Sequence, residues 1–277
     1  MARWKKLLQE SLSKSMKEDK DSISYCLSTI SRVEGRSVGA EGSPARYEYR
    51  PESRTVVHRG FVNERRRHDD HRGAAPDQEE HDASETLLVC TDVRSPKVNQ
   101  LLSLGRAPGE ASSHGVPSPQ SGPLASICWW FAPTGEQYRI QARAYVVSAE
   151  TERDRVAGLT AEQAKRLGPR GGADFEWEAE RVRIYEKLSW ELKASFVGPS
   201  APGSKWDGSD ATAKPANIEK RLEMGDKELR DTALRHFALI ALEPLSIDLV
   251  RLKTDPHQRF SWEKTASGDW EESQLVP

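Results

Sequence analysis

Residues 125–147 read ASICWWFAPTGEQYRIQARAYVV, and they contain the most apolar run of the chain, Ala125–Phe131. After a turn at Thr134–Glu136, apolar and polar side chains alternate for several positions along Gln137–Val147. A period of two is typical of a strand, because successive side chains point to opposite faces of a sheet. Two such strands joined by a short turn predict an antiparallel meander that closes into a β-barrel.

Further strands and helices are predicted on both sides of this pair. Before it, β-branched and apolar runs predict strands at Ile23–Ile30, Arg54–Val62 and Thr86–Thr91. After it, we expect strands at His236–Leu242 and Ile247–Leu252 around a turn at Glu243–Ser246, and a closing segment at His257–Trp262 and Gly268–Val276. Helical spacing of apolar residues predicts helices at Trp4–Met16, Val98–Leu104 and Ile218–Arg235, and a largely helical segment at Glu152–Phe196 that a Gly/Pro break divides at Gly168–Gly172. The expected fold is mainly β (α+β), a barrel with peripheral helices.

Long polar segments interrupt these elements. Val38–Ser53 is polar and punctuated by Pro and Gly, which predicts a loop. We expect three flexible insertions, at residues 63–85, 105–123 and 198–215. The basic run Arg65–Arg67 lies in the first of them, but nearby acidic residues neutralise it and no aromatic residues interleave for base stacking. A solvated insertion is therefore favoured over a nucleic-acid site.

Composition excludes several classes of protein. The formal net charge is −2, which gives no global attraction to nucleic acid or to an anionic membrane. No run of about 18 apolar residues is present, so a membrane-spanning helix is not expected. Cys26, Cys90 and Cys128 each lie in an apolar run without CxxC spacing, which predicts buried free thiols rather than a disulfide or a metal site. We expect a cytoplasmic protein, since no secretory signal is seen.

The common catalytic and nucleotide-binding signatures are missing. The sequence has no GxGxxG or GxxxxGK[ST] motif, no GxSxG elbow and no HExxH. What remains is a set of Arg, Lys, Ser and Thr residues at strand ends and turns. Ser95 and Lys97 lie in the polar turn after Thr91, where hydroxyl, ammonium and backbone N–H groups can converge on a phosphate. Arg54 and Arg59 lie five residues apart, which places them on opposite faces of a strand.

Four segments in this order resemble motifs of the pyridoxamine 5′-phosphate oxidase-like family. SRTVVHRGF (53–61) resembles the RxVxxK/R strand of that family, and TDVRSPK (91–97) resembles its T-(N/D)-x-x-S-x-K turn. EQYRIQARA (136–144) is similar to the family's (E/R)-Q-x-R-(I/V)-x-G strand. The ending HQRF…W…LVP, which begins at residue 257, is similar to HxRF…W…L-x-P. The resemblance covers essentially the whole chain, and thus implies a single domain over residues 1–277.

The resemblance implies a split β-barrel, a homodimer, and FMN held at the subunit interface. Residues expected to line the FMN are Arg54, Thr55, Val56, Val57 and Arg59 on one strand. Thr91, Ser95 and Lys97 would hold the ribityl phosphate, and Gln137 would reach the ring or the ribityl chain. Arg139 would contact the cofactor or support its strand, and Arg259 would approach the flavin from the C-terminal segment. No metal ligand and no catalytic residue are assigned.

The sequence departs from the family mainly where a substrate would bind. Pro96 replaces a residue that is often Arg, and Ala142 stands where the family usually has Gly. Tyr185 and His257 match the family's substrate positions. Other members of that substrate set are replaced, by Ser189, Lys193 and Asp255. Two functions stay open: an FMN-dependent oxidoreductase acting on an unidentified small molecule, and a flavin- or haem-binding split-barrel protein without turnover.

Overall fold

The computed structural model describes residues 2–34, 47–64, 84–104, 122–152, 156, 158–169, 175–208 and 214–277. The strands are β1 (Ser24–Glu34), β2 (Tyr47–Phe61), β3 (Leu87–Asp92), β4 (Leu124–Phe131), β5 (Glu136–Val147), β6 (Phe237–Arg251), β7 (Gln258–Lys264) and β8 (Trp270–Leu275). The helices are α1 (Arg3–Ser15), α3 (Pro96–Leu104), α4 (Ala161–Leu167), α5 (Trp177–Glu186), α6 (Trp190–Ser195), α8 (Ile218–Glu223) and α9 (Lys227–His236). Two short 3₁₀ turns are η1 (Lys20–Ile23) and η2 (Glu150–Glu152).

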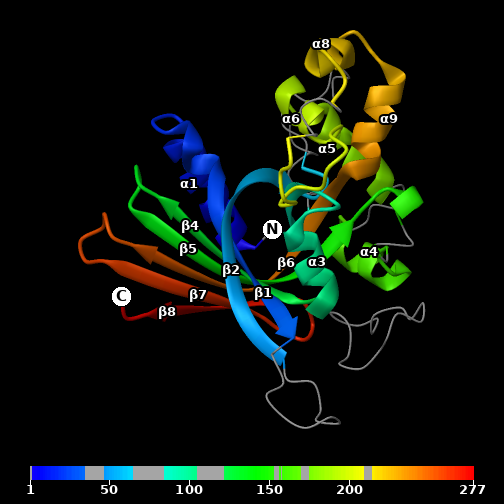
Figure 1. The fold of residues 1–277 in the computed structure, drawn as a ribbon. Helices are drawn as coiled ribbons and strands as arrows, with labels where there is room; N and C mark the ends of the chain where they lie inside the picture. The colour runs from blue at the N-terminus through cyan, green and yellow to red at the C-terminus, as the bar shows by residue number, and fades with distance from the viewer. Residues whose placement is uncertain are drawn as a thin grey trace, which may run out of the picture.

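The strands form one antiparallel sheet in the order β3-β2-β1-β4-β5-β6-β7-β8. An additional pairing of β3 with β6 closes the first six strands into a ring, and β7 and β8 extend the sheet beyond β6 (Figure 1). In this ring β2 and β5 are opposite strands, with two strands between them in either direction. The predicted mainly β, α+β fold with a barrel and peripheral helices is confirmed.

The barrel interior is filled by the inward row of each strand. Along β4 buried and more exposed residues alternate, so that Ile127 and Trp129 are fully buried whereas Trp130 is 45% exposed. The indole of Trp129 donates to the backbone oxygen of Ser22 at 2.8 Å, which satisfies its polar group in the core. Trp4 of α1 packs into the same cluster. The strand predicted from the apolar run Ala125–Phe131 is therefore confirmed, and every second side chain of it points into the core.

A second apolar cluster joins a layer of helices to the outer face of the barrel. It contains Leu88 of β3 and Leu239 of β6, together with Ile184 of α5 and Leu229 of α9. The guanidinium of Arg181 is buried in this layer and donates from Nη1 to the backbone oxygens of Leu234 and Phe237. The rest of the outer face is not covered by these helices, and Figure 1 shows them gathered at one end of the barrel. Within the described residues, no helix is long and apolar enough to cross a membrane.

Three predicted elements are corrected by the structure. The two strands expected around a turn at Glu243–Ser246 are one continuous strand, β6. Its pairing with β5 changes register, because Gln141 faces Ser246 and Ala142 faces Pro244. The extra residue forms a bulge, which accommodates a proline that cannot donate a ladder hydrogen bond. The turn predicted at Glu243–Ser246, which contains Pro244, was therefore wrong.

The other two corrections concern element boundaries. The loop expected over residues 38–53 ends earlier, since β2 already begins at Tyr47 and pairs with β1 as far as Glu34. The helix expected at Ile218–Arg235 is two helices, α8 and α9. They are separated at Gly225, which adopts φ +85°, and Asp226 caps α9 by accepting from the Leu229 N–H. Of the predicted insertions, residues 65–83, 105–121 and 209–213 lie outside the described residues.

Candidate functional site

The turn from β3 into α3 brings three of the predicted residues together. Thr91 is the last residue but one of β3, Ser95 directly precedes α3, and Lys97 lies in the first turn of that helix. The Lys97 ammonium donates to Thr91 Oγ1 at 3.1 Å, and the Thr91 and Ser95 hydroxyls are 3.0 Å apart. Pro96 occupies the first helical position, where a missing N–H costs little and the fixed φ suits a helix.

Arg54 approaches this turn from β2. Its Nη1 donates to Thr29 Oγ1 at 2.6 Å, and its Nη2 donates to Gln100 Oε1 at 2.7 Å. Thr29 is on β1 and Gln100 is on α3, so the guanidinium connects both strands to the helix that carries Lys97. We call Arg54, Thr91, Ser95 and Lys97 the cationic cluster. All four are predicted phosphate or flavin residues, and the structure places them at one end of the barrel.

The electrostatics of the cluster favour an anion. Burial lowers the pKa of Lys97, and the positive charge of Arg54 lowers it further, while Cys90 and Asp92 act in the opposite direction. Burial also lowers the pKa of Arg54, while Glu52 and Cys26 act in the opposite direction. Neither cation forms an ion pair with a carboxylate in the part of the chain that the structure describes. Two neighbouring cations that form no ion pair are stabilised by an anion placed between them.

The nearby acidic residue is already engaged. Asp92 is buried, and its carboxylate accepts from Arg94 through Nε at 3.0 Å and Nη2 at 2.7 Å. Arg94 also donates to the backbone oxygen of Gly198 at 2.9 Å, which ties the segment after α6 to this turn. The bidentate pair holds the turn in shape.

The remaining predicted residues of β2 divide between its two faces. Val56 is buried in the barrel core, whereas Thr55 is exposed and Val57 is half-buried on the outer face. Arg59 also lies on the outer face and donates from Nε to Cys90 Sγ at 3.3 Å, which confirms that Arg54 and Arg59 point to opposite faces.

Among the described residues, one backbone edge of residues 54–57 has no strand beside it. Residues 54–57 pair with β1 on one edge, but in this part of the chain pairing with β3 is found only at His58 and Phe61. The other backbone edge of residues 54–57 is therefore available to a ligand with hydrogen-bonding groups along a flat rim.

Gln137, Arg139 and Arg259 lie elsewhere. Gln137 and Arg139 point outward from β5, the strand opposite β2 in the closed ring. Arg139 and Arg259 both bind the carboxylate of Asp248, at 2.9 and 2.7 Å. We call Gln137, Arg139 and Arg259 the outer group. A single chain does not bring the outer group to the cationic cluster, because the barrel lies between them.

The two predicted substrate residues are also apart from the cluster. Tyr185 is 1% exposed within the helical layer, where it packs against Phe237, and burial raises its pKa to about 12. His257 is exposed in the connection between β6 and β7, where Nδ1 lies 3.1 Å from the backbone oxygen of Thr254. Lys193, another position of the substrate set, is buried and bonded to Glu186. The structure shows no contact that joins these residues into one site among those it describes.

Thr29, Gln100 and Cys90 contact the predicted residues but were not foreseen, and neither was the pairing of Arg94 with Asp92 beside them. Gln100 lies on the same helix as Lys97, one turn further along, so its spacing from Lys97 was the only available signal. Thr29 and Cys90 depend on strand register, which the sequence alone did not fix.

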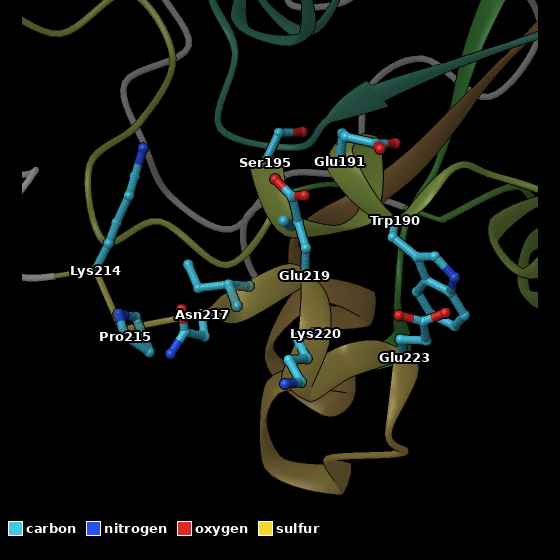
Figure 2. A pocket seen from close by; sticks show the side chains of 11 residues that line it. Trp190, Glu191, Ser195, Lys214, Pro215, Asn217, Glu219, Lys220 and Glu223 are labelled. Atoms are coloured by element: carbon cyan, nitrogen blue, oxygen red, sulfur yellow. The ribbon is translucent and has the colours of Figure 1, made fainter.

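An open groove of about 830 Å³ lies between α6 and α8, and Figure 2 shows its lining. Trp190 and Glu191 come from α6, and Lys220 and Glu223 come from α8. None of the predicted site residues lines it. The described residues also contain no group of three or more His, Cys, Asp or Glu side chains that is placed to hold a metal ion.

Comparisons with known proteins point to the family that the motifs resemble. Residues 1–148 match the family model "Pyridoxamine 5'-phosphate oxidase, FMN-binding domain". The chain is 25% identical over 253 residues to pyridoxine/pyridoxamine 5'-phosphate oxidase 2 of Arabidopsis thaliana, covering 91% of this chain and 89% of the relative. It is 34% identical over 106 residues to the uncharacterized protein YGR017W of Saccharomyces cerevisiae, covering 37% and 34% of the two chains.

Solved structures share the fold. A pyridoxamine 5'-phosphate oxidase-related, FMN binding protein of Nostoc punctiforme superimposes with a TM-score of 0.58 at 19% identity, covering 100% of this chain and 98% of its own. PhzG of Burkholderia lata superimposes with a TM-score of 0.51 at 15% identity, covering 98% and 91%. At these identities the likeness concerns the fold alone.

Proposed function

Because this chain belongs to the pyridoxamine 5′-phosphate oxidase FMN-binding domain family, we propose that it binds FMN with the phosphate in the cationic cluster. The observation that carries the proposal is the convergence of Arg54 and Lys97 without a carboxylate partner among the described residues. A phosphate dianion between them would restore the charge balance that burial disturbs. The residues present therefore fit the cofactor of the family.

Each member of the cluster has a distinct part in holding the phosphate. Lys97 supplies a point charge, and Arg54 presents a planar guanidinium already oriented by Thr29 and Gln100. The Thr91 and Ser95 hydroxyls lie beside the ammonium and can donate to phosphate oxygens after a rotation of their O–H bonds. Because these groups are positioned before binding, little side-chain entropy is lost when the phosphate arrives.

The open backbone edge of residues 54–57 would receive the isoalloxazine ring. Thr55 and Val57 are accessible on the outer face, and Arg59 lies further along the strand. Backbone N–H and C=O groups on an unpaired edge complement the alternating donors and acceptors along the rim of the ring. Bound FMN would supply two-electron redox chemistry, while these residues bind, orient and exclude water from it.

A second copy of the chain is needed to complete the site. The outer group points away from the cationic cluster across the barrel, so one flavin does not meet both within one chain. A homodimer that places the outer group of one chain against β2 of the other brings all the predicted residues to one cofactor. Exposed apolar side chains on the same sheet, Leu124 and Trp130, are suited to such an interface.

The proposed activity is that of an FMN-dependent oxidoreductase acting on a small molecule. The substrate is not assigned, because Tyr185 is buried in the helical layer and Lys193 is paired with Glu186. Binding of pyridoxine 5′-phosphate would need a second group of side chains that holds a phosphate. The described residues at the family's substrate positions do not come together to form such a group.

The protein as purified tests this proposal. We expect a yellow protein that releases FMN on denaturation, and whose flavin absorbance is bleached by NAD(P)H or a chemical reductant and returns in air. A colourless protein that does not take up added FMN would contradict the cofactor assignment. In a second outcome, FMN is bound, but only dithionite reduces it and no acceptor reoxidises it. That result would contradict the oxidoreductase role and support a flavin-binding protein without turnover.

A further inference from the structure

Two of the three cysteines are direct neighbours across a pair of strands. Cys26 of β1 faces Cys128 of β4 in the antiparallel register. Residues directly opposite in such a ladder have Cα atoms about 4.5–5.5 Å apart and side chains on the same face. Disulfides span Cα separations of about 4.4–6.8 Å, so the spacing of paired strands lies within the range that a disulfide bridges.

The pair also differs from the buried thiols expected from the sequence, and that expectation is corrected here. Cys128 is exposed, and Cys26 and Cys90 are half-buried. The apolar run around Cys128 belongs to a strand whose alternate residues point outward, so the thiol faces away from the core. A thiol at an exposed position can meet a reagent from solvent.

The register gives the neighbours of the two thiols in the sheet. Cys128 lies opposite Arg139 of β5, and Cys26 lies opposite Thr55 of β2. The thiolate is the form of a cysteine that attacks a disulfide. Cys90 is separate from the pair, on β3 against Arg59.

We propose that Cys26 and Cys128 form a reversible redox site that closes to a disulfide joining β1 to β4. The oxidant is a small-molecule disulfide such as oxidised glutathione. One thiolate attacks a sulfur of that disulfide and releases the first small thiol. The second cysteine then attacks the mixed disulfide, releases the second small thiol and forms the Cys26–Cys128 bond. Two protein thiols are oxidised, one disulfide is reduced, and no other electron acceptor is required.

The cysteine pair contains none of the residues assigned to FMN. In the proposed dimer, Cys128 lies beside Arg139 on the face toward the second copy, so the small-molecule disulfide reaches the pair in the separated chain. The rate of closure therefore depends on protein concentration, whereas the product, a bond within one chain, does not.

The test incubates the reduced full-length protein with oxidised glutathione, blocks the remaining thiols with an alkylating reagent, and maps peptides by mass spectrometry. We expect a chain that has lost the mass of two hydrogens, with Cys26 joined to Cys128 and Cys90 alkylated. The Cys90→Ser variant should behave in the same way. Cys26→Ser and Cys128→Ser should each stop at a stable glutathione adduct on the cysteine that remains.

The outcomes that overturn the proposal are equally distinct. These are a wild-type protein that only accumulates glutathione adducts, a disulfide that contains Cys90, or a disulfide between two chains. The peptide map of the wild-type protein decides among them even if one of the serine variants does not fold.

Discussion

The ammonium nitrogen of Lys97 lies 3.1 Å from the hydroxyl oxygen of Thr91, and that hydroxyl lies 3.0 Å from the hydroxyl of Ser95. Arg54 reaches the same end of the barrel through Gln100, which shares a helix with Lys97. A strand end, a helix start and a neighbouring strand therefore converge on one small volume, in which neither cation forms an ion pair with a described carboxylate. The predictions below follow from that arrangement.

Replacing Lys97 should weaken the binding of FMN and leave the binding of riboflavin nearly unchanged. Lys97→Ala removes one charged contact to the phosphate, and hydrogen bonds to charged groups contribute about 1.5–3 kcal/mol. We expect FMN affinity to fall about tenfold or more and riboflavin affinity to change little, as measured by fluorescence titration. Lys227→Ala on the exposed surface of α9 is the matched control and should bind both ligands like the wild type. An equal loss for both ligands would place Lys97 away from the phosphate.

The same residue predicts a dependence of FMN binding on pH. The pKa of Lys97 is lowered by burial and by Arg54, so in the free protein its proton is lost below the usual lysine range. The phosphate binds the protonated form more tightly, and FMN affinity should therefore fall as the pH rises through the lowered pKa. The measured quantity is the ratio of FMN to riboflavin affinity, in which ionisation of the flavin ring itself cancels. In Lys97→Arg the fall should move to higher pH, and a ratio independent of pH in the wild type would count against the assignment.

Gln100 offers a test that leaves both cations in place. Its amide oxygen accepts from Arg54 Nη2 at 2.7 Å. Gln100→Glu puts a carboxylate at that point, which neutralises the guanidinium and repels the phosphate. We expect FMN affinity to fall about tenfold, on the scale of one charged contact, whereas the neutral variant Gln100→Ala should lose less. If both variants bind FMN equally, Arg54 does not contribute its charge to the site.

Mixing variants tests whether two chains share each site. Lys97→Ala and Gln137→Ala each damage one half of a site. In a dimer with one chain of each kind, one site carries both defects and the other carries none. An unfolded and refolded equimolar mixture should thus regain about a quarter of the wild-type FMN sites. Sedimentation should show a dimer in every sample. No recovery on mixing would mean that Gln137 serves its own chain.

Much of the fold could be predicted from local patterns in the sequence, and the predictions that failed did so for physical reasons. The apolar run Ala125–Phe131 and the alternation in Gln137–Val147 were sufficient because β4 and the first part of β5 each have one buried and one less buried face, although residues 144–147 of β5 are buried on both faces. Pro244 misled because a bulge in β6 satisfies the backbone without reversing the chain. A proline in a strand and a proline in a turn are not distinguished by sequence when the register of the partner strand is unknown.

The candidate site was only partly accessible to sequence reasoning. The turn from Thr91 to Lys97 is local, so its residues were found together. The contacts of Arg54 with Thr29 and Gln100 depend on strand register and on the docking of α3, which act over many residues. The face on which Cys26 and Cys128 meet depends on the pairing of β1 with β4, and composition suggested the opposite environment.

The central claim is that the cationic cluster binds the phosphate of FMN. Its most direct test is a parallel fluorescence titration of the flavin-free wild-type protein with FMN and with riboflavin, which share the ring and differ in the phosphate. The structure predicts that FMN binds at least about tenfold more tightly, in line with one or more charged contacts. Equal affinities for the two ligands, or no binding of either, would contradict the claim.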